Sequence, residues 1–171
     1  MPISDYLKNL RAKIGRDLVV LPAACTSILD EQDRLLLGKD AETGFWMLPG
    51  GAVDPHEQPA DAAVRECFEE TGLLVELRGV IGVFGGPEFL VRYPNGDVTY
   101  YITTAFRAVI IGGSREPCDG ELTELCYFSQ SECENLNLSP ASVIIAKTTF
   151  INSTTTFFHP AASHRSARDV I

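Results

Sequence analysis

Residues 51–73, with the sequence GAVDPHEQPADAAVRECFEETGL, contain the clearest local structure signals in the chain. Pro59 suits the first position of a helix, and no glycine or proline interrupts the segment from there to Thr71. Gly72 stands where a left-handed residue ends many helices. The pattern predicts a helix over residues 59–71 that follows a glycine-containing loop.

This helix carries a group of carboxylates. At 100° per residue, Glu66, Glu69 and Glu70 fall within about 100° of arc. Their charges repel one another, so we expect a cation among them, and carboxylate oxygens suit Mg²⁺ or Mn²⁺. The alternative, an ordinary solvated helix face, is the commoner meaning of a charge run. The other side is predicted to pack on a sheet, and it carries Ala60, Ala63, Val64, Cys67, Phe68 and Thr71.

Arg65 is predicted to connect the helix to the loop. It lies four residues before Glu69 and within reach of Glu57. A guanidinium can bind both oxygens of a carboxylate at once. We therefore expect Arg65 to hold residues 51–57 against the helix, as a scaffold residue rather than a group that reacts.

Upstream of the loop, the sequence predicts a short helix followed by strands. Ser4 can cap the helix, Gly15 can end it, and its apolar stripe predicts that it packs on the rest of the domain. The polar turn of residues 30–34 separates apolar stretches, which favours strands joined by a hairpin. The stripe is Leu7, Leu10 and Ile14, and the expected strands cover residues 18–21, 24–29 and 35–37, with another ending near Leu48.

Downstream of the helix, strands predominate. Asn95-Gly96 is a strong hairpin turn, Gly112-Gly113 is expected to end a long strand, and the tail from Asn152 has little periodicity. Strands that outnumber the helices and interleave with them predict a mixed α/β domain. The expected strands are residues 74–77, 80–84, 89–93, 98–111 and 124–128, and a closing helix is expected at 141–147.

The composition excludes several classes of protein. A chain of 171 residues, 45% of them hydrophobic, suits one globular domain. Its net charge of −9 opposes non-specific binding to nucleic acid or anionic membranes, and an anionic substrate would need a bridging cation. No apolar run is long enough to span a bilayer. Five cysteines without a C-x-x-C pair favour reduced thiols and a cytoplasmic location: Cys25, Cys67, Cys118, Cys126 and Cys133.

The central segment resembles the Nudix box, which reads glycine, five residues, glutamate, seven residues, Arg-Glu, an apolar residue, any residue, Glu-Glu, any residue, glycine and an apolar residue. Every fixed position of this pattern is present between Gly51 and Leu73. Residues 46–51 are also similar to the family's approach to the box. The chain departs from the family at three places: Cys67 replaces a larger aliphatic residue, His56 stands where many members have glycine, and Gly38-Lys39 stands where relatives often have basic residues that bind substrate.

The resemblance implies an α/β/α sandwich with a mixed β-sheet, in which the box is a loop–helix–loop. The Nudix domain would span residues 18–150, between an N-terminal helical extension at 1–17 and a tail at 151–171. It also implies a divalent metal ion, and the groups that would hold it are the Gly50 carbonyl and the carboxylates of Glu66, Glu69 and Glu70.

The resemblance further implies a set of catalytic residues. Glu69 is the carboxylate expected to take a proton from water. The family's general base often lies before the last strand, where Glu121 is best placed, with Glu124 and Asp119 behind it. Arg65 and Glu57 complete the set as the pair that holds the loop against the helix.

The implied function is metal-dependent hydrolysis of the diphosphate linkage in a nucleoside diphosphate derivative, such as a nucleotide or a nucleotide sugar. The leaving moiety stays open. The partner would be a small-molecule diphosphate, with no nucleic acid and no membrane, and family members often form homodimers. A different class is a catalytically silent sensor of such a ligand. Five aromatic residues either stack on a base or belong to the core: Trp46, Phe89, Tyr93, Tyr100 and Tyr101.

Overall fold

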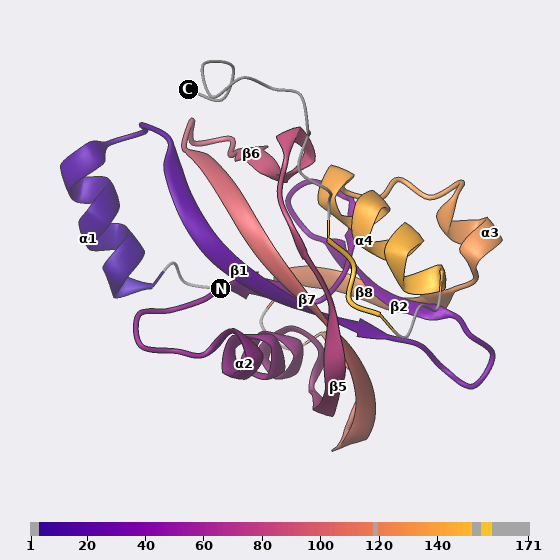
Figure 1. Ribbon diagram of the computed structural model, residues 1–171. Coiled ribbons are helices and arrows are strands. Elements are labelled where there is room, and N and C mark those ends of the chain that lie inside the picture. The colour runs from indigo at the N-terminus through magenta and orange to yellow at the C-terminus, as the bar shows by residue number, and fades with distance from the viewer. Residues whose placement is uncertain (1–3, 118–119, 152–154, 159–171) are drawn as a thin grey trace.

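Two sheets form the centre of the molecule, which is described here by a computed structural model of residues 4–117, 120–151 and 155–158 (Figure 1). In the larger sheet β1 and β7 are parallel and the other neighbours are antiparallel, so the sheet is mixed. Its strand order is β4 (Gly50–Ala52), β1 (Val19–Ile28), β7 (Val98–Gly113) and β5 (Leu73–Phe84), with β6 (Leu90–Arg92) paired to β7. The smaller, antiparallel sheet contains β3 (Trp46–Met47), β2 (Leu35–Asp40) and β8 (Leu122–Phe128).

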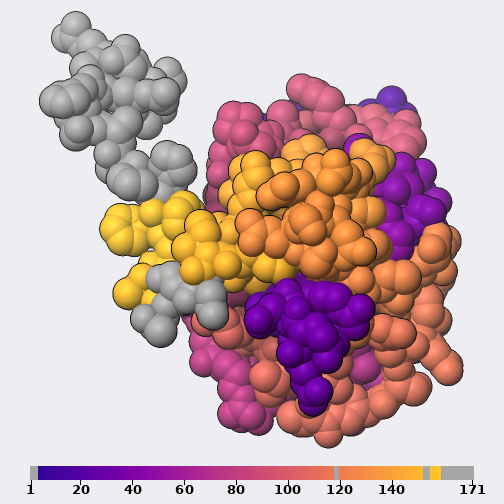
Figure 2. Space-filling model, turned by 90° about the vertical axis from the view of Figure 1, so that its right-hand side faces the viewer, coloured from indigo at the N-terminus to yellow at the C-terminus, as the bar shows by residue number. Residues whose placement is uncertain are grey.

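Helices cover both faces of the larger sheet, which confirms the expected sandwich (Figure 1). α2 (Pro59–Thr71) lies against β1 and β5, and α4 (Pro140–Phe150) lies on the other side after the short α3 (Gln130–Cys133). Residues alternate along β7, so Phe106 packs with alanines of α2 whereas Ala105 joins the core beneath α4. The orange and yellow surface in Figure 2 shows α3 and α4 on this second face.

α2 has the predicted bounds, and its ends are those that the sequence indicates. Pro59 occupies the first turn, and Gly72 ends the helix in the left-handed conformation with φ 70°. The Gly72 N–H donates to the Phe68 carbonyl at 2.8 Å. The box is therefore a loop–helix–loop between β4 and β5.

The strands are longer than the sequence pattern predicts. The apolar stretches on either side of Pro22 form one strand, β1. On the side of β4, pairing covers only Ala23 to Cys25, so Pro22 lies beyond the paired residues, where a proline is tolerated in a strand. The stretches at 74–77 and 80–84 likewise form one strand, β5, with irregular pairing around Gly79. Gly112-Gly113 does not end β7 early, since both glycines still pair with the start of β5.

The predicted hairpin between β1 and β2 is wrong in its pairing. Only one bridge, Leu29 to Leu35, joins the two segments. β2 then pairs with β8 and β3 in the smaller sheet, so the turn at residues 30–34 connects two sheets instead of two neighbouring strands. The Asn95-Gly96 hairpin is confirmed, because β6 and β7 pair across it, and a short 3₁₀ turn, η1 (Pro87–Phe89), precedes it.

The N-terminal helix forms as predicted but buries little. α1 (Asp5–Ile14) is capped by Ser4, whose hydroxyl accepts a hydrogen bond from the Leu7 N–H, and its final cap is Gly15. None of its residues is buried, so the predicted packing of its stripe is only partial. Among the described residues, no helix has the length and apolar character needed to cross a membrane.

Residues 155–158 lie along β5. The Phe157 N–H donates to the Ile81 carbonyl at 2.7 Å, and the Phe157 ring stacks on Phe84 with 5.5 Å between centroids. The rest of the tail from Asn152, like Asp119 and Cys118, lies outside the described residues.

We predict that Gly72→Ala lowers the free energy of unfolding by about 1–2 kcal/mol, because a Cβ is unfavourable in the left-handed conformation. Urea unfolding followed by circular dichroism measures the change. Gly79→Ala is the matched control, since that glycine has no heavy atom within 4 Å of an added Cβ and no positive φ. Equal stability of the two variants would contradict the assigned role of Gly72.

Candidate active site

The carboxylates of α2 do not form a solvated stripe. Glu66 and Glu70 are buried, with 1% and 5% of their surface exposed, while the Glu69 side chain is 41% exposed. Phe68, which the sequence pattern places on the packing face, is instead 49% exposed. The buried residues are Ala62, Ala63, Glu66, Cys67, Glu70 and Thr71, a stripe at helical spacing that includes two glutamates. The predicted inner face is therefore correct for Ala63, Cys67 and Thr71 but misses the two buried glutamates, because it groups the helix by polarity alone.

Small side chains allow α2 to approach the sheet closely. Ala62 and Ala63 are fully buried and pack with Ala24 of β1, and Cys67 packs with Leu36 and Ile28 in a neighbouring cluster. This contact carries Glu66 and Glu70 inward, to the antiparallel pairing of β1 with β4. The helix therefore delivers two carboxylates to the loop that begins at Gly50.

Gly50 and Gly51 leave room for those carboxylates. The Gly50 N–H donates to Glu70 Oε2 at 3.0 Å, and Gly50 has φ 156°, where L side chains are rarely found. A Cβ on Gly51 would lie 2.6 Å from Oε1 of Glu66, and a Cβ on Gly50 would lie 2.5 Å from the backbone of Cys25. A larger residue at either position would displace the loop or the acid beneath it.

Arg65 forms the network that the sequence predicts, and it extends further than predicted. Its Nε and Nη2 donate to the two oxygens of Glu57 at 2.8 and 2.9 Å, and Nη2 also donates to the Ala52 carbonyl at 3.2 Å. Its Nη1 donates to Glu66 Oε1 at 2.8 Å and to Glu69 Oε2 at 3.1 Å. One guanidinium thus fixes the loop and offsets part of the repulsion between the helix carboxylates.

Burial raises the pKa of a carboxyl group in the site, whereas hydrogen bonds from Arg65 lower it. Burial raises the pKa of Glu66, although Arg65 acts against that shift. The hydrogen bonds from Arg65 lower the pKa of Glu57, so that carboxylate stays charged. Burial, assisted by the charge of Glu70, raises the pKa of Cys25 to about 12. The Cys25 thiol is therefore protonated at neutral pH and is not a nucleophile.

The donor set fits a hard divalent cation in its chemistry. Three carboxylates and the Gly50 carbonyl supply oxygen ligands of the kind that Mg²⁺ and Mn²⁺ take. Within the described ranges, however, no three acidic, histidine or cysteine side chains converge closely enough to hold a metal ion. Glu66 and Glu69 instead share one nitrogen of Arg65 as hydrogen-bond donor.

The candidate bases outside the box lie on the smaller sheet. Glu121 stands just before β8, and its carbonyl accepts a hydrogen bond from the Ala41 N–H at 2.8 Å. Glu124 forms an ion pair with Lys39 at 2.7 Å. Trp46 and Phe89 are buried in the core, which favours the packing interpretation for these aromatic residues.

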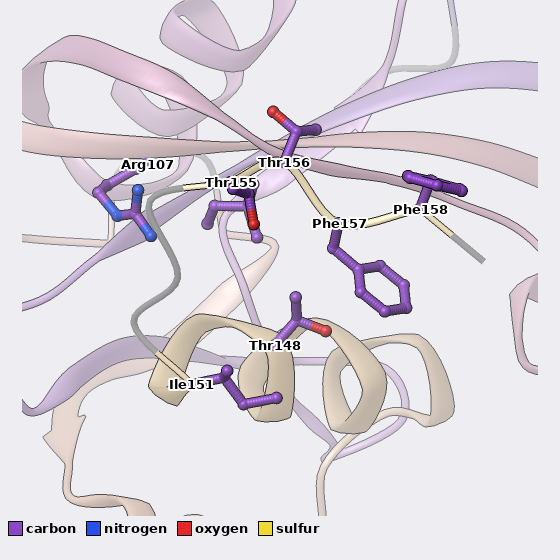
Figure 3. Close-up of a pocket in the computed structure, with 8 residues that line it drawn as sticks. Arg107, Thr148, Ile151, Thr155, Thr156, Phe157 and Phe158 are labelled. Atoms are coloured by element: carbon purple, nitrogen blue, oxygen red, sulfur yellow. The ribbon is translucent and has the colours of Figure 1, made fainter. Parts of the chain in front are cut away.

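Two cavities lie on opposite sides of the larger sheet. One cavity, of about 320 Å³, is lined by Arg65 and Glu66 and by residues of α1. The sequence did not indicate that α1 lies next to the site, because no local pattern in α1 points to a ligand. The other, of about 260 Å³, lies between the end of α4 and residues 155–158, where Arg107 and Thr148 face it (Figure 3). Only the first adjoins the carboxylates of α2.

Comparisons with known proteins identify relatives of the chain. A family model described as the NUDIX domain matches residues 20–147. The putative 8-oxo-dGTP diphosphatase of Bacillus subtilis is 47% identical over 62 residues, which cover 36% of this chain and 42% of that protein. The ADP-ribose pyrophosphatase of Methanocaldococcus jannaschii is 34% identical over 124 residues, which cover 71% of this chain and 69% of that protein. The Bacillus match thus spans less than half of that relative.

Solved structures support the fold. The MutT protein of Methanosarcina mazei superimposes with a TM-score of 0.63 at 20% identity, covering 81% of this chain and 99% of that one. At this identity the likeness concerns the fold alone.

We predict that Arg65→Met lowers the free energy of unfolding by about 2–4 kcal/mol, because it leaves Glu66 buried without its guanidinium. Adding Glu66→Gln to that variant should restore part of the loss, since it removes the unpaired charge. Chemical denaturation of the two variants measures both effects.

Arg78→Met is the matched control. Arg78 pairs with Glu76 at 2.9 Å, but both side chains are 52% exposed, so the expected change is below about 1 kcal/mol. Equal losses from Arg65→Met and Arg78→Met would mean that the Arg65 network contributes no more than a surface ion pair.

Proposed function

The chain belongs to the Nudix domain family, and we propose that it hydrolyses the diphosphate linkage of a nucleoside diphosphate derivative with the help of a divalent metal ion. One observation carries the proposal: Glu66 and Glu70 are buried beneath Gly50 and Gly51, where Arg65 donates to Glu66 and the Gly50 N–H donates to Glu70. Acids are rarely buried without a partner or a role. The domain would span residues 18–150, with 1–17 and 151–171 as extensions.

The residues that would hold Mg²⁺ or Mn²⁺ are Glu66, Glu69, Glu70 and the carbonyl of Gly50. The ion would neutralise the diphosphate and lower the pKa of an attacking water. Because Arg65 also bonds to both oxygens of Glu57, it can stay attached to the loop while Glu66 and Glu69 turn toward a ligand. The box therefore keeps its shape when its acids change partners.

Two carboxylates are candidates to accept the proton from water. Glu69 is the most exposed of the box acids and lies beside the others on α2. Glu121 precedes β8, whereas the Glu124 carboxylate is paired with Lys39. The Glu69 carboxylate is our first choice and Glu121 the second, and a positioned base of this kind contributes about 10²-fold or more to the rate.

The alternative function is a sensor that binds a nucleotide derivative without turnover. The chain keeps every fixed residue of the box, which favours catalysis.

We also propose a cytoplasmic location, because the thiols are expected to be reduced and the four described cysteines are all free. The assembly that we propose to test for is a homodimer. The proposed binding partner is a small-molecule diphosphate, with no nucleic acid and no membrane.

We predict that Glu69→Gln and Glu70→Gln each reduce turnover by at least about 100-fold while the fold survives. Phosphate release from nucleoside triphosphates, nucleotide sugars, ADP-ribose and dinucleoside polyphosphates measures activity, with Mg²⁺, Mn²⁺ or a chelator. Glu76→Gln, an exposed carboxylate on β5, should leave turnover unchanged. If both Glu69→Gln and Glu70→Gln turn over substrate at the rate of the unmodified protein, these residues have no catalytic role. If a compound binds but is not hydrolysed with any of the metals, the sensor function is favoured.

We predict that Glu121→Gln lowers kcat by about 100-fold, with KM little changed, if its carboxylate accepts the proton. Glu124→Gln is the control, because it removes a carboxylate three residues further along the chain, in β8, that is paired with Lys39. A full rate in the Glu121 variant would leave Glu69 as the base.

A further inference from the structure

The cavity is lined by Arg65 and Glu66 of α2 and by three other parts of the chain. β1 supplies its floor with Val20 and Pro22, the loop after β4 supplies Val53 and Asp54, and α1 supplies the remaining wall. Its volume of about 320 Å³ lies at the lower end of the range for small-molecule sites. Because Arg65 and Glu66 of α2 line the cavity, a ligand in it would lie next to a group held at Glu66.

α1 is fixed in place although it buries none of its residues. Arg11 Nη2 donates to the Val98 carbonyl at 2.9 Å and to Thr99 Oγ1 at 3.0 Å, and Nη1 donates to the Asp17 carbonyl at 2.6 Å. Its Nε lies 3.7 Å from the Asp97 carboxylate, and both side chains are largely buried. These contacts anchor the end of α1 to the start of β7, and at the other end of the helix Tyr6 and Leu7 line the cavity.

The chemistry of the walls selects a neutral, flat ligand. Tyr6 is an aromatic residue that lines the cavity while 51% of its surface is exposed. An exposed ring can stack on a planar heterocycle, and Val20 and Val53 offer apolar contact on the other sides. The Asp54 carboxylate can accept a hydrogen bond from a ring N–H or an amino group. A highly anionic ligand is disfavoured, because Arg65 already serves several acceptors and Asp54 and Glu66 add negative charge.

We propose that this cavity binds the nucleobase of the substrate, with Tyr6 as the stacking surface and Asp54 as the hydrogen-bond acceptor, while the diphosphate lies at the carboxylates of α2. The proposal rests on the proposed function for the identity of the ligand. It assigns the N-terminal helix, which lies outside the residues 20–147 matched by the family model, a part in substrate specificity.

The experiment measures binding without turnover. The full chain, Tyr6→Ala, Tyr6→Phe and Asn9→Ala are titrated in a calorimeter with the α,β-methylene analogues of ADP and GDP, and with methylenediphosphonate, which lacks a base. Asn9 is exposed on the same helix and does not line the cavity, so its variant is the matched control. Tyr6→Ala should weaken binding of at least one nucleotide analogue by about tenfold, in the range for loss of one base stack. Tyr6→Phe and Asn9→Ala should retain the affinity of the full chain.

The base-free probe separates this proposal from the proposed function. Methylenediphosphonate should bind all four proteins equally. Unchanged nucleotide affinity in Tyr6→Ala, an equal loss for the base-free probe, or failure of the full chain to bind either nucleotide analogue would overturn the proposal. Failure of hydrolysis alone, with Tyr6-dependent binding intact, would overturn the proposed function and leave the cavity assigned.

Discussion

The structure depends on holding two carboxylates, Glu66 and Glu70, between a helix and a glycine loop. Removing charged groups from water is costly unless they gain partners. The Gly50 N–H serves Glu70, Arg65 serves Glu66, and the absence of side chains at Gly50 and Gly51 permits the close approach. These features together permit the burial of Glu66 and Glu70.

This constraint also organises the neighbouring elements. α2 needs small residues on its inner face, and Ala62, Ala63 and Cys67 provide them. Two bonds from Arg65 to Glu57 connect the loop to α2, and under the proposed function they would hold the loop in place when Glu66 and Glu69 bind a metal ion. The same loop forms one wall of the adjoining cavity. The loop would therefore support both the carboxylates that act on a diphosphate and the surface that binds the nucleobase.

Local signals in the sequence predicted some of this and missed the rest. Proline, glycine and helical spacing gave the bounds of α2, and Asn95-Gly96 gave its hairpin, because backbone preferences of those residues act within a few positions. The transfer of β2 to a second sheet depends on pairing with β8, which is distant in the chain. The inner position of Glu66 and Glu70 was missed because polarity, without the loop above it, predicts exposure. The place of α1 follows from Arg11 reaching Val98 and Thr99, which no short pattern encodes.

The most direct test of the central claim is crystallography of the protein with Mn²⁺ and a non-cleavable nucleotide, using the anomalous signal of manganese to locate the ion. The account predicts a peak within ligand distance of the carboxylates of Glu66, Glu69 and Glu70 and of the Gly50 carbonyl, with the Arg65 to Glu57 pairing retained. A peak elsewhere, or a bound nucleotide whose phosphates turn away from these groups, would contradict it.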